Sequence, residues 1–269
     1  MKQLPPVELA PVLTAAASNM RQGRTITAGN HITLTDAGAG STMTVEWKPN
    51  WRKLAVLYSD MNSAADWTNY ATLGSNLFTT AGANDDGNRV GVLDSSTSTS
   101  ASGSAGIGNA AQDTVVFGAA VHRLTAVCKL PVLSTAAQTY TVVIGFSDSR
   151  TTALPADGVF FSYTHGTNSG RWTAMSYSNS LSSTLFTDTA ITADTAWHTY
   201  EIAVNAAATI ALFYIDGVLV ATRSTAASDS IPTGSARATA ANVTIIKSVG
   251  TTSRSLYTDL LALEVDCAR

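Results

Sequence analysis

The sequence has 269 residues, of which 45% are hydrophobic and only 13% are charged, with a formal net charge of −3 and a pI near 5.7. This balance excludes the basic surface typical of proteins that bind nucleic acids or anionic membranes. No apolar run reaches the roughly 18 residues of a membrane-spanning helix, and the N-terminus lacks the basic-then-apolar order of a secretory signal. We therefore expect synthesis in the cytoplasm, no membrane insertion and no nucleic-acid partner.

Residues 1–24 mix proline, alanine and polar residues without a regular period. Pro5, Pro6 and Pro11 prevent a helix before residue 12. Such a segment is either a flexible arm or an arm that becomes ordered against a partner.

Residues 25–45 alternate threonine with Ile, Leu, Met and Val, and glycine-rich turns interrupt the alternation. This pattern predicts short strands with one apolar face and one threonine face. A unit of this size cannot bury its apolar face alone, so it needs the main domain or further copies of itself. We therefore assign residues 1–50 to a small extended and β-stranded attachment and oligomerisation segment.

From Trp51 onward, short apolar runs recur about every 10–15 residues with almost no helical period. The clearest is a hairpin in residues 210–222, whose apolar arms flank Asp216 and Gly217, a pair that tolerates the positive φ angles of a type I′ turn. Both arms are apolar at nearly every position, which predicts central strands covered on both faces. About a dozen such strands predict an all-β sandwich in residues 51–269.

The order of several segments carries a family resemblance. These segments are residues 115–117, 141–148, 157–163, 171–172, 197–198, 213–217 and 245–252. Together they resemble the concanavalin-A-like, laminin-G-like jelly roll of tailed-bacteriophage fibre and other virion surface proteins. Residues 29–45 also resemble short β elements of phage fibres and spikes. The resemblance implies a sandwich of two antiparallel sheets whose first and last strands lie side by side.

The resemblance also implies a function. We expect a non-enzymatic phage virion structural protein, displayed on the virion surface and bound to other virion proteins through residues 1–50. Fibres and spikes are usually trimers, so a homotrimer is expected. One hypothesis is a tail fibre that binds a host cell-surface glycan, and its alternative is a capsid decoration or head-fibre protein anchored by residues 1–50. A third, different in class, is a polysaccharide-cleaving enzyme.

Aromatic residues in the predicted loops are the candidates for glycan binding, because sugar sites combine flat aromatic faces with nearby polar side chains. The candidate residues are Trp67, Tyr70, Tyr163, His165, Trp172 and Tyr177. The alternative is that these rings seal the ends of the sandwich core.

Catalytic and metal-binding patterns are not found in the sequence. The four histidines occupy separate segments, without metal-ligand spacing: His31, His122, His165 and His198. No E-x-D-x-E arrangement exists for glycoside hydrolysis, and the best acidic pair is Glu264 and Asp266. Residues 84–88 lack the spacing of an EF-hand loop and predict an Asx-rich turn. We expect no cofactor, although laminin-G-like domains often hold a structural calcium ion through loop carbonyls.

The two cysteines, Cys128 and Cys267, are in phase with inward positions of their strands. The resemblance implies that these strands are neighbours, which leaves two alternatives. A disulfide would close a loop of about 140 residues and contribute at most about 5 kcal/mol. Two buried free thiols suit a protein assembled in a reducing cytoplasm.

Overall fold

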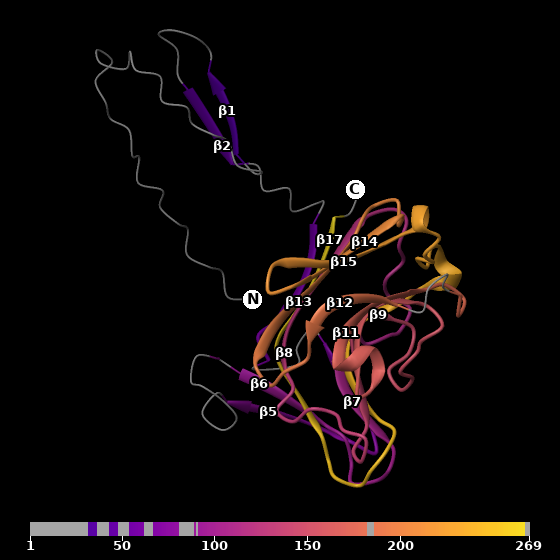
Figure 1. Cartoon of the computed structure of the whole chain (residues 1–269). Coiled ribbons are helices and arrows are strands. Elements are labelled where there is room, and N and C mark those ends of the chain that lie inside the picture. The colour runs from indigo at the N-terminus through magenta and orange to yellow at the C-terminus, as the bar shows by residue number, and fades with distance from the viewer. Residues whose placement is uncertain are drawn as a thin grey trace. The chain divides into compact units, whose positions relative to one another are not determined.

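The structure is a computed structural model, and it describes residues 32–36, 43–47, 54–61, 67–80, 89, 91–181 and 186–266. The chain divides into two units, residues 1–50 and residues 51–269. In the first unit, β1 (Ile32–Asp36) pairs antiparallel with β2 (Met43–Trp47). The second unit contains the other described strands (Figure 1).

Seven strands of the second unit form one antiparallel sheet, in the order β12-β11-β10-β9-β16-β7-β4. Their bounds are β4 (Thr68–Thr72), β7 (Gly103–Gly108), β9 (Tyr140–Ser147), β10 (Gly158–Thr164), β11 (Arg171–Tyr177), β12 (Thr187–Thr192) and β16 (Ala240–Lys247).

The other sheet has eight strands, in the order β15-β14-β13-β8-β17-β6-β5, with β3 also paired to β17. Their bounds are β3 (Leu54–Ser59), β5 (Ser75–Thr80), β6 (Gly91–Ser96), β8 (Val121–Lys129), β13 (Trp197–Val204), β14 (Ile210–Ile215), β15 (Val218–Ser224) and β17 (Ser255–Asp266). The N-terminal part of β17 pairs with β6 and its C-terminal part with β3, so the first and last strands of this unit are neighbours.

The described residues contain no α-helix. Three short 3-10 turns occur in the connections: η1 (Thr167–Gly170), η2 (Thr225–Ala227) and η3 (Ser235–Arg237). No helix in the described ranges has the length and apolar content needed to cross a membrane.

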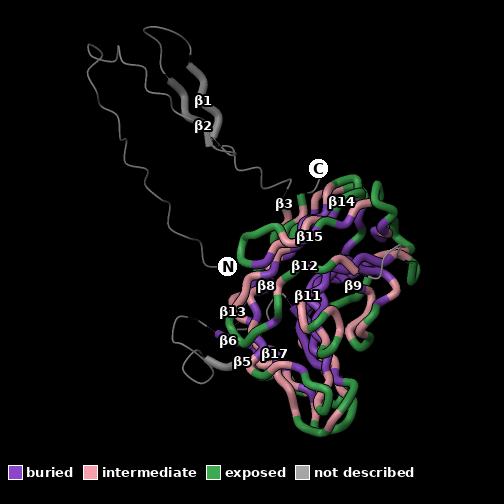
Figure 2. The backbone as a smooth tube through the Cα atoms, viewed as in Figure 1, coloured by how far each residue is buried: buried purple, intermediate pink, exposed green. Residues whose placement is uncertain are grey.

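The core lies between the two sheets, because alternate residues of each strand point inward. Figure 2 shows this buried layer in purple. At its centre the Phe161 ring meets the rings of Phe213 and Tyr200 edge-on, with centroids 5.1 and 5.6 Å apart. This packing between antiparallel sheets confirms the predicted all-β, concanavalin-A-like jelly-roll sandwich.

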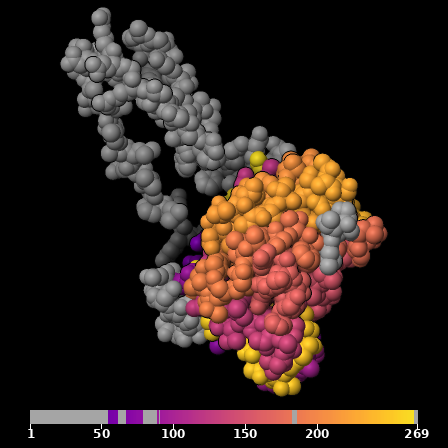
Figure 3. Space-filling view, viewed as in Figure 1, coloured from indigo at the N-terminus to yellow at the C-terminus, as the bar shows by residue number. Residues whose placement is uncertain are grey.

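The predicted hairpin is present as β14 and β15. Asp216 and Gly217 have φ angles of 51° and 76°, as a type I′ turn requires. The prediction that both arms are central strands is wrong, because β15 is an edge strand. Leu219 is 51% exposed, and the orange strands β14 and β15 lie at the surface in the space-filling view (Figure 3).

Candidate functional site

The outward side of the seven-stranded sheet carries small hydroxyl side chains on adjacent strands, most of them buried. We call the following six residues the hydroxyl face: Ser104, Thr141, Ser162, Thr164, Thr173 and Thr244. Each alternates along its strand with side chains of the core. In register, Ser162 pairs with Thr173 on one side and Val143 on the other, and Val143 pairs with Thr244. The hydroxyl groups therefore recur across neighbouring strands of one surface.

Tyr70 on β4 bounds this face on one side. Its register partner is Gly106, where an added Cβ would lie 2.8 Å from the Tyr70 hydroxyl. The phenol crosses this glycine and forms a hydrogen bond with Thr244 Oγ1, while the guanidinium of Arg150 stacks 4.5 Å from the ring centroid. Burial raises the pKa of Tyr70, so its phenol stays protonated. A planar aromatic–guanidinium pair thus lies beside the hydroxyl face.

Charged and amide groups bound the face on the opposite side. Asp188 is the register partner of Thr173 and accepts hydrogen bonds from Arg171 Nη1 and Asn168 Nδ2, each 2.8 Å long. The bonds from Asn168 and from the Ala190 backbone hold the pKa of Asp188 below its usual value. Thr141 and Thr164 lie between this cluster and Tyr70, with their hydroxyl oxygens 2.6 Å apart.

Three buried polar atoms at one end of this sheet face have no hydrogen-bond partner among the described residues. Asn242 is fully buried between its register partners Gly108 and Gly145, and its Nδ2 donates to Ser147 Oγ over 2.8 Å. Its Oδ1 has no hydrogen-bond partner among the described residues, and neither does Asp148 Oδ1 nor Arg150 Nε. Burial raises the pKa of Asp148, and the nearby Asp157 carboxylate adds to the effect. Unpaired buried polar atoms are costly, so three of them are an unusual feature of this end of the sheet.

An apolar cluster completes the surface. Val143, Phe160, Met175 and Tyr177 pack together on the outer face, with Phe186 and Ile246 against them. The rings of Phe160 and Tyr177 are stacked with centroids 6.1 Å apart. The outward side of this sheet therefore carries hydroxyl, amide, charged and apolar groups side by side, and the four residues of the apolar cluster are at most 7% exposed.

The six predicted glycan-binding residues fall in different places. Trp67, Tyr163 and Trp172 lie in the core with at most 4% of their surface exposed, so their rings do not face solvent. Within the core, Trp172 packs against Tyr163 and Tyr200, with ring centroids 5.6 and 4.7 Å away. Tyr177 belongs to the apolar cluster of the outer face and Tyr70 bounds the hydroxyl face.

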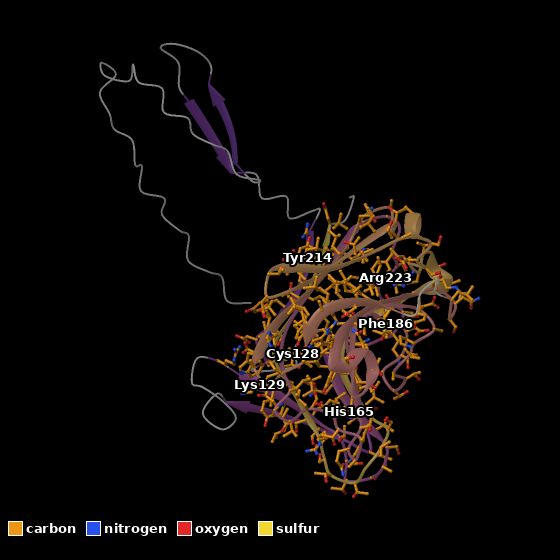
Figure 4. The ribbon with its side chains drawn as sticks, viewed as in Figure 1. Cys128, Lys129, His165, Phe186, Tyr214 and Arg223 are labelled. Carbon is orange, nitrogen blue, oxygen red and sulfur yellow. The ribbon has the colours of Figure 1, made fainter. Side chains whose placement is uncertain are left out.

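The sixth candidate, His165, is exposed in the turn between β10 and β11. Figure 4 labels His165 toward the lower end of the domain, with Phe186 above it and Tyr214 nearer the upper end. Sequence reasoning missed the hydroxyl face itself, although the outward threonines of β9, β10 and β16 alternate with apolar residues in the sequence. This alternation is the sequence feature from which the hydroxyl face could have been predicted.

One histidine and two carboxylates form a cluster at the start of β13. His198 Nδ1 lies 2.6 Å from Asp216 Oδ2 and its Nε2 lies 2.9 Å from Asp194 Oδ1. Burial alone would lower the pKa of His198, but hydrogen bonds to the two carboxylates outweigh burial and raise it. Because both ring nitrogens are held, the imidazole is not free to act as a base toward its register partner, Cys128.

Cys128 is a buried thiol 3.9 Å from Thr258 Oγ1, and burial raises its pKa to about 12. The strands β8 and β17 are neighbours, as the resemblance implied. Their register pairs Cys128 with Thr258 and Asp266 with Val121, so the last described residue of β17 lies at the opposite end of β8 from Cys128. Cys267 lies outside the described residues.

In the described part of the chain, no group of three or more His, Cys, Asp and Glu side chains is arranged to hold a metal ion. His31 and the predicted Asx-rich turn at residues 84–88 lie outside that part. Glu264 and Asp266, the predicted acidic pair, are exposed on β17.

The chain is similar to solved structures of this fold. A protein of unknown function, SO2946 from Shewanella oneidensis MR-1, matches with a TM-score of 0.58 and 16% identity over 81% of this chain and 89% of that one. An endo-1,3-beta-glucanase from Streptomyces sioyaensis matches with a TM-score of 0.52 and 14% identity over 84% and 100%. A carbohydrate esterase from the Shiga toxin-encoding bacteriophage phi24B matches with a TM-score of 0.46 and 16% identity over 74% and 90%.

One of these neighbours corrects a prediction. We expected a chain without enzymatic activity, but an endo-1,3-beta-glucanase is among its structural neighbours, which contradicts that expectation. The expectation rested on the absence of a carboxylate motif within one strand. The fold also brings together carboxylates from separate segments, as with Asp194 and Asp216 around His198.

Curated proteins give no match to this sequence. A family model described as the SO2946-like C-terminal domain matches residues 88–259, which span β6 to β16 and the start of β17. The chain therefore belongs to the family of SO2946-like C-terminal domains.

Proposed function

We propose that residues 51–269 bind a glycan through the outer face of the seven-stranded sheet. The observation that carries this proposal is the row of hydroxyl side chains that ends near Asn242, whose buried Oδ1 has no hydrogen-bond partner among the described residues. A sugar presents many hydroxyl groups that both donate and accept hydrogen bonds, and it would satisfy such atoms.

The rest of the surface supports the same ligand class. The face of a pyranose ring is apolar, and its edge is polar. Tyr70 offers a planar group at one boundary of the hydroxyl face, and Arg171 offers guanidinium donors at the other. Sites for small molecules combine apolar area with a few well-placed polar groups, and the partly exposed Tyr70 ring and Arg171 guanidinium supply one group of each kind.

The setting that we propose is the surface of a tailed-phage virion, where a displayed jelly roll would recognise a host cell-surface glycan. Residues 1–50 would attach it to other virion proteins. The phage resemblance of residues 29–45 and the hairpin of β1 and β2 in that segment support this assignment. In the alternative setting, the same domain decorates the capsid.

A glycan array probed with the purified chain tests the binding proposal. We expect selective binding that falls at least tenfold in Asn242→Ala and in Tyr70→Ala. The control is Leu181→Ala, at an exposed position in the β11–β12 turn. No binding to any bacterial surface glycan or β-1,3-glucan would contradict the proposal. The bound sugars should also be analysed for shorter products, which reports cleavage in the same experiment.

Immunogold labelling of intact virions tests the setting. An antibody against residues 51–269 should label the tail if the domain binds a receptor. Label spread over the head would favour capsid decoration, and unlabelled particles would contradict both settings.

A further inference from the structure

Two connections lie side by side at one end of the second unit. One joins β6 to β7 and contains only Ser, Thr and Ala in residues 97–102, and the other joins β16 to β17 in residues 248–254. Thr97 N donates to Arg254 O over 2.8 Å, and Arg254 N donates to Thr97 Oγ1 over 3.0 Å. Figure 1 shows the two connections in magenta and yellow at the lower end of the domain. These hydrogen bonds fix the backbone of Arg254 beside the connection that is rich in Ser and Thr.

Lys247 reaches the same connection from the end of β16. It is only 3% exposed, and its register partner on β7 is Gly103, the first residue after the connection. Its Nζ donates to Ser98 O over 2.7 Å. Because Ser98 follows Thr97, Lys247 and Arg254 are hydrogen-bonded to consecutive residues of one connection.

These two cations lack an acidic partner. In the described ranges, neither Lys247 nor Arg254 forms an ion pair with a carboxylate, whereas the buried Arg223 is paired with Asp229. Arg254 Nε is buried without a hydrogen-bond partner among the described residues, and Lys247 uses one of the three donors of its ammonium group there. Burial lowers the pKa of Lys247, and the positive charge of Arg254 adds to this effect. An anion bound between the two side chains would satisfy the unpaired donor and offset the repulsion.

The donors of this cation pair indicate which anion fits. An arginine guanidinium presents a planar fork of N–H groups that binds two oxygens of one oxyanion, and a lysine ammonium adds a compact charge with rotatable donors. A carboxylate carries one negative charge, whereas a phosphate group carries about −1.5 to −2 at pH 7 and has three acceptor oxygens. We propose that Lys247 and Arg254 bind a phosphate group, either of inorganic phosphate or of a phosphate ester.

This site is separate from the hydroxyl face. Lys247 is in phase with Val243 and Ile245, whose side chains belong to the core, whereas Thr244 of the hydroxyl face points to the other side of β16. Phosphate binding therefore goes beyond the proposed glycan binding, and either claim can fail without the other.

Thermal unfolding of the full chain in increasing sodium phosphate, at constant ionic strength, tests the proposal. A ligand that binds only the folded state raises the unfolding temperature, so the wild type should melt at higher temperature as phosphate increases. Lys247→Met and Arg254→Gln should each need at least tenfold more phosphate for the same rise. The control is Arg123→Gln, which removes the same charge from an exposed side chain 3.7 Å from Glu201 and should match the wild type within twofold. No rise in the wild type, or the wild-type response in both site variants, would overturn the proposal.

The unfolding temperature in phosphate-free buffer separates anion binding from a purely structural role. Arg254→Gln keeps the backbone hydrogen bonds to Thr97 and removes a positive charge near Lys247. It should therefore melt at or above the wild-type temperature when no phosphate is present, and it tests the proposal even if Lys247→Met does not fold. A lower unfolding temperature would show that the guanidinium stabilises the fold without an anion, which would overturn the proposal.

Glucose 6-phosphate distinguishes the two sources of the phosphate group, with glucose as the control for the sugar. A rise that matches inorganic phosphate and is lost in Arg254→Gln would assign the site to phosphate esters. A rise with inorganic phosphate alone would assign it to the free ion. Both results support the proposal, whereas a rise with glucose 6-phosphate that Arg254→Gln retains in full would overturn it for esters.

Discussion

His198 Nδ1 lies 2.6 Å from Asp216 Oδ2, and this contact connects the start of β13 to the turn between β14 and β15. The other oxygen of Asp216 accepts the backbone N–H of Thr199 at 2.8 Å. One carboxylate thus joins two sequence motifs, the Trp197-His198 pair and the Asp216-Gly217 turn.

We predict that His198→Gln destabilises the domain by about 1.5–3 kcal/mol at pH 6, the usual loss for a hydrogen bond to a charged group. Because the folded-state pKa of His198 is raised, its contribution is complete below pH 6.5 and is lost as the pH rises through the folded pKa. The pKa of Asp194 is lowered by hydrogen bonds from the Ala196 backbone and from His198, so its contribution is lost in acid. Urea unfolding between pH 5 and 9 measures the difference. A difference that does not shrink toward pH 9, or one matched by His165→Gln, would contradict this account.

Arg223 joins the two sheets at their edge. It is fully buried on β15, forms an ion pair with Asp229 at 3.0 Å and donates to Ser176 and Thr187 of the other sheet. We predict that Arg223→Met lowers the free energy of unfolding by about 3–5 kcal/mol, because it leaves Asp229 buried without its cation. Arg223→Met/Asp229→Asn should recover at least half of that loss in urea unfolding. A single variant as stable as the wild type would show that the pair does not hold the sheets together.

Gly145 allows β9 and β10 to approach closely. Its φ angle is 147°, and an added Cβ would lie 2.6 Å from Val159 O and 2.7 Å from Phe160 Cα. Gly145→Ala should therefore lower the free energy of unfolding by more than the roughly 1–3 kcal/mol that a strained backbone conformation costs alone. Gly166→Ala is the matched control, since its φ is 76° but nothing lies within 4 Å of the added Cβ. Equal losses of thermal stability in both variants would mean that the close approach is unimportant.

The Cys128 thiol should be unreactive in the folded protein. Burial raises its pKa to about 12, so little thiolate exists at neutral pH. In a Cys267→Ser background, iodoacetamide at pH 8 should label Cys128 at least a hundredfold faster in 8 M urea than in buffer. Comparable rates, followed by mass spectrometry, would show that the strand pair of β8 and β17 opens readily.

Much of the fold could be predicted from the sequence. The Asp216-Gly217 turn and the alternation in residues 197–204 are local signals, and local signals predict hairpins well. The edge position of β15 could not be inferred, because an apolar strand looks the same whether a sheet or a second protein covers it. That ambiguity explains why Leu219 was expected to be buried and is exposed.

The candidate site was harder to predict. Trp67 and Trp172 are the residue type that often binds sugars, but in the structure both side chains point inward and belong to the core. Thr141, Thr164 and Thr244 come from three strands distant in sequence, and only the register places their hydroxyl groups on one surface. The sequence of any one strand does not contain that information.

The most direct test of glycan recognition is calorimetric titration of a sugar identified on the array against two threonine variants. Thr164→Arg introduces a bulky cation into the hydroxyl face, whereas Thr222→Arg places the same side chain at an exposed position on β15. The account predicts that Thr164→Arg abolishes measurable binding and that Thr222→Arg binds within twofold of the wild type. Unchanged binding by Thr164→Arg would contradict the central claim.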